Sequence, residues 1–202
     1  MNKVIDAIKS RRSIRKYTGK RIPKKVVSLI IEAGRYAPSS HNSQPWRFIV
    51  ISNKELIKSL SEYIRIWFKR RIILGSLIGF FNHKIKKEIE AAKNMVNNKA
   101  YSFFYNAPLL VLICAKPGRF ALVDCALAGG NMMLAARSLG IGSCWIGFAD
   151  MVINKNKRLM KKLGVSSDCK IMGHLIFGYP STRFPSKAFE RKKEAGVVRW
   201  VC

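Results

Sequence analysis

The chain has 202 residues, and 49% of them are apolar. This fits one domain with a substantial core, since a chain of this size buries roughly 70% of its unfolded surface. Lysine and arginine number 38 against 11 acidic residues, and the resulting charge of +27 favours anionic partners without selecting one. The five cysteines form no C-x-x-C pair, so a disulfide framework, a zinc site and an iron–sulfur module are unsupported, and we predict no metal.

The first quarter of the chain predicts two helices, a polar loop and a strand. A short amphipathic helix is expected over residues 2–10, and it ends at the basic run Arg11-Arg12-Ser13-Ile14-Arg15-Lys16-Tyr17. Pro23 then opens a second helix, because proline suits the first helical position. The stiff segment Pro38–Trp46, with two prolines, three serines and two amides, cannot continue that helix. It leads into a strand over residues 46–51.

Residues 64–100 are expected to form a helical excursion. The preceding helix is expected to start after Asn53, whose side chain suits an N-cap. Within the excursion, the ten uncharged residues Ile72–Phe81 are too few to span a bilayer. A basic amphipathic helix on an anionic membrane surface stays a minor alternative. Residues 84–99 show the periodicity of a further helix.

The rest of the chain predicts strands around one central helix. Leu109–Ile113 is continuously apolar, so both faces of that strand should be covered. The helix expected over about 121–139 is apolar nearly all round, which is typical of a buried helix, and Asp124 suits its positive end. Gly129 and Gly130 each cost roughly 1 kcal/mol relative to alanine, which suggests close approach of a backbone or a ring. The other expected elements are a strand at 143–147, a helix at 154–164, a strand at 170–178 and an edge strand at 197–201.

Two segments carry most of the functional signal. The arginines of the basic run can bind a phosphate bidentately, with Ser13 as a further donor, although a basic cluster is more often a solvated face. The hydroxyl and amide side chains of Pro38–Trp46 suit a flat polar heterocycle, but they could equally form a turn before a strand. The three histidines form no Ser–His–Asp or Cys–His set, so we assign no catalytic side chain.

Together the two segments resemble the nitroreductase family of flavoproteins. That family opens with R-x-S-x-R/K and carries P-S-S-x-N-x-Q-P-W about 25 residues later, and both motifs occur here in that order and spacing. Further similarities are Asn106-Ala107-Pro108, Ser143-Cys144-Trp145-Ile146-Gly147, Gly178-Tyr179-Pro180 and Trp200. The chain departs from the family at Gly130, where glutamine or glutamate is usual, so a polar contact is expected to be missing there.

The resemblance implies an α+β fold and a homodimer. Residues 1–202 are expected to form a single domain, with a central mixed, mostly antiparallel sheet flanked by helices. The excursion at 64–100 would cover the flavin pocket of the partner, and residues 179–202 would form a C-terminal arm that extends onto the partner subunit. FMN is the implied cofactor, and NAD(P)H is the implied electron donor.

The resemblance also assigns residues to the flavin phosphate and its neighbourhood. Arg11 and Ser13 are the best candidates for the phosphate and the ribityl chain, and Arg12 is next. Arg15 is the candidate for the N1–O2 side of the ring, where negative charge gathers on reduction. In the C-terminal arm, the basic group Arg191-Lys192-Lys193 is the implied partner of the phosphate, and Lys187 is a competing choice.

The flavin ring has a second set of implied neighbours. Ile146 is expected to pack beside the ring, and Gly147 is expected to offer a backbone N–H toward N5. The flavin bound by the other subunit is expected to be lined by four residues of the polar loop: Pro38, Ser39, Ser40 and Asn42. Gln44 is expected either to order the loop or to touch the polar edge of the ring. His41 is expected to line the pocket without acting as an acid.

We predict an oxidoreductase that transfers hydride from NAD(P)H through flavin N5 to nitroaromatic, quinone or flavin acceptors. No signal peptide is recognised, so the expected location is the cytoplasm. Two alternatives stay open: a flavin carrier or sensor with little turnover, and a reductase fed by an acidic ferredoxin or flavodoxin, which the charge favours. Simple solubility also accounts for the charge. Specific nucleic-acid binding rests on charge alone, without a recognisable motif.

Overall fold

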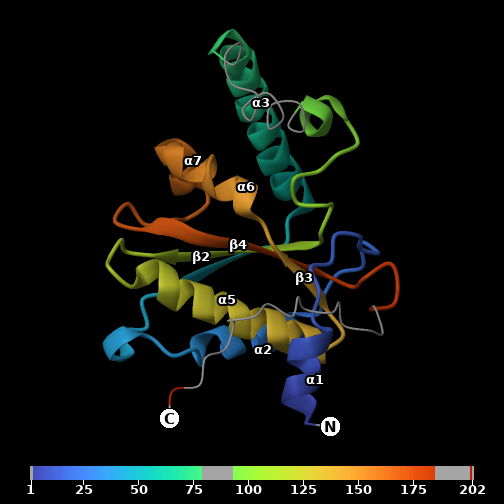
Figure 1. The fold of residues 1–202 in the computed structure, drawn as a ribbon, viewed down its shortest axis with the longest axis vertical. Helices are drawn as coiled ribbons and strands as arrows, with labels where there is room; N and C mark the ends of the chain where they lie inside the picture. The colour runs from blue at the N-terminus through green and yellow to red at the C-terminus, as the bar shows by residue number, and fades with distance from the viewer. Residues whose placement is uncertain (1, 79–92, 185–200, 202) are drawn as a thin grey trace.

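A four-stranded antiparallel sheet forms the centre of the computed structural model, which describes residues 2–78, 93–184 and 201 (Figure 1). The strands are β1 (Arg47–Ile51), β2 (Leu109–Ala115), β3 (Gly142–Trp145) and β4 (Lys170–Gly178), in the order β1-β2-β4-β3. The central pair β2–β4 runs from Leu109 opposite Phe177 to Ala115 opposite Lys170, with a register shift after Ile113. The sheet was predicted as mixed; the described strand pairs are antiparallel, and an isolated parallel bridge joins Ser13 to Ser143.

Helices cover both faces of this sheet (Figure 1). One face carries α2 (Lys24–Arg35) and α5 (Ala121–Ser138), and α1 (Lys3–Ser10) contacts α5. The other face carries α3 (Lys54–Ile78), α6 (Gly147–Asp150), a 3-10 turn at Ile153–Lys155 and α7 (Lys157–Lys162). Among the described helices, none has the length and apolarity that crossing a bilayer requires.

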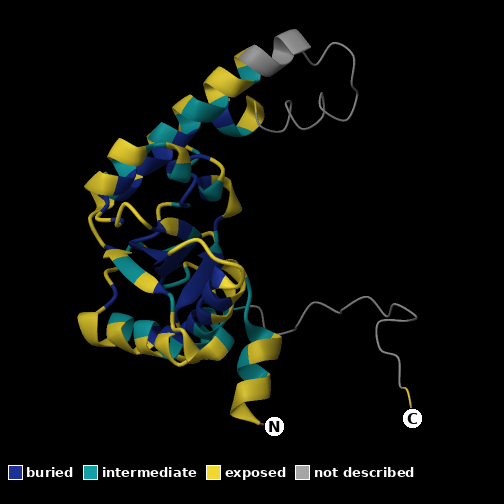
Figure 2. Ribbon diagram, turned by 90° about the vertical axis from the view of Figure 1, so that its left-hand side faces the viewer, coloured by how far each residue is buried: buried dark blue, intermediate teal, exposed yellow. Residues whose placement is uncertain are grey.

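The core divides into two clusters because the β2 side chains alternate between the two faces. Leu110 and Leu112 pack toward α3, whereas Leu109, Val111 and Ile113 pack toward α2 and α5. All seven β2 residues are buried, which confirms the prediction that both faces of this strand are covered. Figure 2 shows the buried residues gathered around the sheet, while α1 and residues 66–73 of α3 are exposed or intermediate.

Several predicted boundaries shift. Pro23 is the N-cap of α2, one residue before the first helical position. Asn53 caps α3 as predicted, since its Oδ1 accepts from the Leu56 N–H at 3.0 Å, but the helix continues through residue 64 to Ile78. The helix expected over 154–164 is divided, because Asn156 caps α7 instead. The end of the chain at 185–200, where most of the edge strand was expected, and residues 79–92 lie outside the described residues.

The prediction that the central helix is buried all round is wrong for a single copy of the chain. α5 buries Ala128 and Met132 against the sheet side, but Leu122 and Val123 are 60% and 55% exposed. The two adjacent glycines also differ. A Cβ on Gly129 would lie 2.6 Å from the Trp145 ring, whereas one on Gly130 would meet nothing within 4 Å. The predicted close approach of a ring therefore holds for Gly129 alone.

Candidate active site

Residues 11–18, which we call the strap, run alongside β3 and the end of β4. Ser13 bridges Ser143, and the Ile14 N–H donates to the Ser143 carbonyl at 2.9 Å. Further on, the Thr18 N–H donates to the Tyr179 carbonyl at 3.0 Å. Because these are backbone hydrogen bonds, they hold the strap whatever polar side chains it carries.

Two glycines let the strap lie close to the sheet. A Cβ on Gly142 would lie 2.8 Å from the Cβ of Ile14, and one on Gly178 would lie 2.6 Å from the Tyr17 ring. The Tyr17 hydroxyl also donates to the Ile14 carbonyl at 2.6 Å. Burial raises the pKa of this phenol, so Tyr17 stays neutral and anchors the strap.

The polar side chains of the strap gather around Cys144 on β3. Burial raises the pKa of the Cys144 thiol, and the nearby Arg15, Ser13 and Arg11 act in the opposite direction. Ser13 and Arg15 are exposed, and the Arg15 guanidinium lies 5.8 Å from the centre of the Tyr105 ring. Within the described residues, no carboxylate forms an ion pair with Arg11 or Arg15. Both guanidinium groups can therefore bind an external anion.

Arg12 has a different environment from its neighbours. Its Nη1 donates to the Lys9 carbonyl at 2.8 Å and to the Arg11 carbonyl at 2.5 Å. These carbonyls lie where α1 ends, so the guanidinium satisfies backbone acceptors that the helix leaves open. Arg12 thus fixes the junction between α1 and the strap, and it stays a weaker candidate for a phosphate.

Residues 38–46, which we call the serine–proline loop, form a strained turn. His41, Asn42 and Gln44 adopt left-handed backbone conformations, with φ of 52°, 52° and 44°. The Gln44 N–H donates to Ser39 Oγ, and the Gln44 side-chain amide donates to Asn42 Oδ1, both at 3.0 Å. Pro38, Asn42 and Gln44 are exposed, while Ser39 and Ser40 are half-buried. The loop therefore presents polar groups in a fixed shape.

The segment after β3 combines a buried residue with an open glycine. Ile146 is buried, and its N–H donates to the His174 carbonyl at 2.8 Å. Gly147 is exposed at the start of α6, where a Cβ would meet nothing within 4 Å. The N-cap of this helix, Ile146, has no polar side chain to cap it, so within the described residues the first N–H groups of α6 stay available to a ligand acceptor.

The strap and the serine–proline loop lie at opposite ends of α5. At its first turn, Asp124 accepts from the Ser40 N–H at 3.1 Å; at its last turn, Arg137 Nε donates to Ser10 Oγ at 3.0 Å. Thirteen helical residues separate these two positions, which is about 20 Å along the axis. One protomer thus brings the strap and Ile146–Gly147 together, but not the loop. Arg191 and Lys192 lie outside the described residues.

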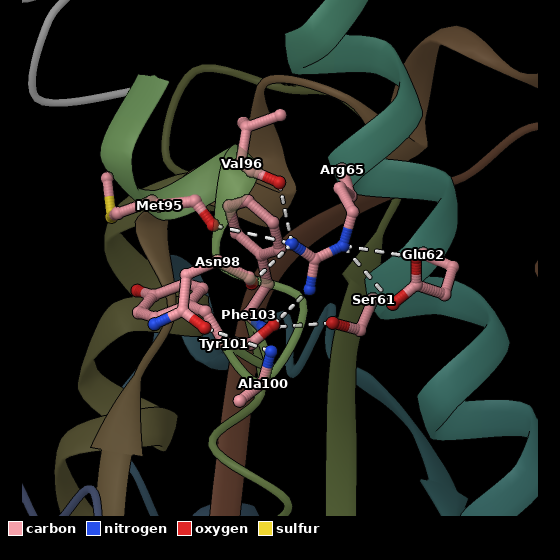
Figure 3. Close-up of polar contacts among 9 residues, drawn as sticks. All are labelled: Ser61, Glu62, Arg65, Met95, Val96, Asn98, Ala100, Tyr101 and Phe103. Carbon is pink, nitrogen blue, oxygen red and sulfur yellow. Dashed lines mark hydrogen bonds and ion pairs between the residues drawn. The ribbon is translucent and has the colours of Figure 1, made fainter.

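Arg65 on α3 binds the backbone of the segment from Val96 to Tyr101 (Figure 3). Its guanidinium donates to the carbonyls of Val96 and Asn98, both at 2.9 Å, and to that of Tyr101, while Glu62 pairs with its Nε at 3.1 Å. Ser61, also on α3, accepts from the Phe103 N–H at 2.9 Å. These contacts fix residues 95–103 against α3.

Phe103, which these contacts hold against α3, belongs to a cluster of three aromatic side chains. Phe68 stacks on Phe103 with 5.8 Å between ring centres, and Phe148 meets both edge-on at 6.0 and 6.3 Å. Phe148 directly follows Gly147 and is 39% exposed. The cluster therefore places apolar ring surface next to the open start of α6.

A buried histidine on β4 is paired with the last residue of α6. His174 on β4 is fully buried, and its Nδ1 donates to Asp150 Oδ1 at 2.5 Å. Its Nε2 is buried and has no hydrogen-bond partner among the described residues. The pair joins the end of α6 to the sheet, close to the Ile146–Gly147 segment.

Sequence analysis missed three of these residues. Asp124 was interpreted as a charge that suits the end of a helix. Its position in an otherwise apolar helix could also have indicated a polar partner elsewhere in the chain. Arg65 lies in a run of basic residues on α3, and nothing in that run distinguishes it. His174 stands inside an apolar strand pattern, where a lone histidine marks a polar contact without naming its partner.

The family comparison agrees with this geometry. The Nitroreductase family matches residues 8–179. A solved nitroreductase with bound FMN from Bacteroides fragilis is 31% identical, with both chains covered completely and a TM-score of 0.76. A second, from Desulfitobacterium hafniense, also with bound FMN, is 25% identical over 100% of this chain and 99% of that one, with the same TM-score. An FMN reductase [NAD(P)H] from Bacillus subtilis is 29% identical over 93% of this chain and 70% of its own.

The chain therefore belongs to the nitroreductase family, and its fold is α+β as predicted. The predicted class of enzyme, an NAD(P)H-dependent flavoprotein oxidoreductase, is confirmed with it.

Proposed function

We propose that two copies of this chain bind FMN at their interface and reduce small acceptors with electrons from NAD(P)H. The observation that carries this proposal is the separation of the strap from the serine–proline loop by the length of α5. A two-fold axis beside α5 would set the loop of one copy against the strap of the other. The site would then be complete only in the dimer.

The exposed apolar surface supports the dimer. α5 exposes Leu122, Val123 and Leu127, which lie on one side of the helix. α1 has no buried residue and exposes three aliphatic side chains: Val4, Ile5 and Ile8. Both helices would gain by covering these side chains, because apolar area removed from water contributes about 25 cal/mol per Å². A second copy of the chain would cover these side chains and would also complete the site.

The residues of the candidate site fit the cofactor. FMN carries a dianionic phosphate, and Arg11 and Arg15 are guanidinium groups without a protein carboxylate partner in the described chain. The planar ring needs close approach to backbone, and the open space above Gly147 provides it. When bound, FMN supplies the hydride chemistry, and the protein contributes orientation and charge.

Each candidate residue has a specific task in this arrangement. Arg11 and Ser13 bind the phosphate and ribityl chain, and Arg15 stabilises negative charge on the N1–O2 side of the ring. Ile146 packs beside the ring, while the Gly147 N–H donates toward N5. The partner's loop contributes the remaining contacts through Pro38, Ser39, Ser40, Asn42 and Gln44. In the C-terminal arm, Arg191 and Lys192 stay predictions for the phosphate.

Nitroaromatic, quinone or flavin molecules are the proposed acceptors. Phe148 presents ring surface beside Gly147, and Phe68 and Phe103 fix it in place. A flat aromatic acceptor could stack there next to the cofactor. This surface supports ring-shaped acceptors as a class and does not select one.

An acidic protein donor is the second candidate function. The charge of +27 would raise the local concentration of an acidic ferredoxin or flavodoxin and speed its association. In that case reduction by nicotinamide would be slow, and reduction by the carrier would fall steeply with salt.

One set of measurements on the purified protein tests these proposals. We expect bands near 370 and 450 nm that added FMN restores after removal, a dimer by light scattering, and rapid bleaching by NADH or NADPH with turnover on menadione or nitrofurazone. FMN binding without turnover by any donor would support a carrier or sensor. A colourless monomer that ignores FMN would overturn the proposed function.

A further inference from the structure

Asp124 is a buried carboxylate at an unusual place. It is 4% exposed, in the first turn of α5, yet it does not cap its own helix, where Phe120 is the N-cap. Its Oδ1 instead accepts from the Ser40 N–H at 3.1 Å, across 84 residues of sequence. A buried charge is costly unless hydrogen bonds and a favourable field compensate it. Here the Ser40 N–H and the positive end of α5 do so.

The serine–proline loop needs such an anchor. His41, Asn42 and Gln44 each adopt a left-handed backbone that costs roughly 1–2 kcal/mol in a residue other than glycine. The hydrogen bonds from Asn42, Ser43 and Gln44 run back to Ser39 and Ser40 and stay inside the loop. Within the described chain, Asp124 therefore provides the polar link between this turn and the rest of the protein.

We propose that Asp124 is a positioning residue that sets the affinity for FMN through the serine–proline loop. It does not touch the cofactor itself, because it is buried beneath the loop. By fixing the Ser40 amide, it holds the strained turn in the one shape that presents Ser39, Asn42 and Gln44 to the flavin of the partner. The inference rests on the proposed function and adds a residue that acts from a distance.

The test compares Asp124→Ala, Asp124→Asn and a control, Glu55→Ala. Glu55 is an exposed acid in the first turn of α3, so its replacement makes the same change of charge away from the loop. Loss of a hydrogen bond to a charged group should weaken FMN binding about tenfold in Asp124→Ala, measured by fluorescence titration of the apoprotein. Asp124→Asn keeps an acceptor oxygen and should recover most of that loss, while Glu55→Ala should bind as the native protein does.

Hydrogen exchange of the apoprotein provides a second, cofactor-independent measurement. The peptide covering residues 38–46 should exchange at least several-fold faster in Asp124→Ala, with peptides of β2 and β4 unchanged. Unchanged exchange in the loop, or FMN affinity equal in Asp124→Ala and the native protein, would overturn the proposal. So would an Asp124→Asn variant no better than alanine. If the native protein binds no FMN, the proposed function fails, and the exchange data still decide whether Asp124 anchors the loop.

Discussion

The strap and the serine–proline loop serve the same proposed site but are held by different forces. The strap is fixed by backbone pairing to β3 and β4 and by the packing of Ile14 and Tyr17 on glycines. Among the described residues, the loop has backbone hydrogen bonds only within itself, and it depends in addition on two side-chain acceptors, Ser39 inside the loop and Asp124 outside it. Polar substitutions in the two regions should therefore have separable effects. At Arg11, Ser13 and Arg15 of the strap they should alter ligand binding alone, whereas in the loop they should alter shape and binding together.

The largest effect is expected from the strap arginines. Replacing Arg11 and Arg15 by alanine should weaken FMN binding by roughly a hundredfold or more, since each charge-assisted contact contributes about 1.5–3 kcal/mol. The melting temperature of the apoprotein should stay nearly unchanged, because backbone bonds hold the strap. Fluorescence titration and thermal melts measure the two quantities. The control is the double variant Lys24→Ala/Lys25→Ala, which removes the same charge from α2 and should bind FMN normally. If the strap variant bound FMN within threefold of the native affinity, the assignment of Arg11 and Arg15 to the cofactor would be wrong.

The packing of the strap can be broken at Gly142. Its replacement by alanine places a Cβ against Ile14, and overpacking of this kind costs about 1–3 kcal/mol. We expect lower stability in urea together with weaker FMN binding, because Ile14 must move and take the strap with it. Gly118→Ala is the control, since a Cβ there meets nothing within 4 Å. Equal stability of the two variants would mean that the strap is not packed as described.

Replacing Ser39 by alanine should weaken both FMN binding and the fixed shape of the loop. This change removes the acceptor of the Gln44 N–H, a hydrogen bond of about 1 kcal/mol, so FMN affinity should fall about fivefold. Exchange in residues 38–46 should rise at the same time, unlike in the strap variant. Ser43→Ala is the matched control, because the Ser43 hydroxyl makes no hydrogen bond within the described residues. A similar loss in both variants would show that the internal bond is unimportant.

The smallest effect is expected from Gly130 on α5, the helix that joins the two regions. Gly130→Ala should stabilise the protein by about 0.5–1 kcal/mol, because alanine favours the helix and the added methyl meets open space. Gly129→Ala should destabilise it, since the methyl would collide with Trp145. Urea unfolding of both variants measures the difference. A stabilised Gly129→Ala would contradict the described packing of α5 on the sheet.

The family and much of the fold could be predicted because the motifs that carry them are local. The order and spacing of Arg11–Arg15 and Pro38–Trp46 were enough for the family, and the apolar run at Leu109 was enough for a strand covered on both faces. Boundaries were less accurate where a side chain had a tertiary partner. Asn154 was predicted to start a helix that runs to residue 164, but it lies in a short 3-10 turn, where its side chain bonds the backbone of Ile171 at 2.8 and 2.9 Å, and α7 begins only at Lys157. No local pattern announces such a contact.

The amino-acid sequence alone identifies candidates for contact with a phosphate and a polar ring, because backbone stiffness and donor chemistry are properties of the residues. Its apolar content also predicts one core. The folded chain was needed to show that the strap and the loop lie at opposite ends of α5, and that Asp124 and Arg65 hold distant segments. Those contacts join residues about 30 to 84 positions apart. Their energies depend on burial and geometry, which exist only once the chain has folded.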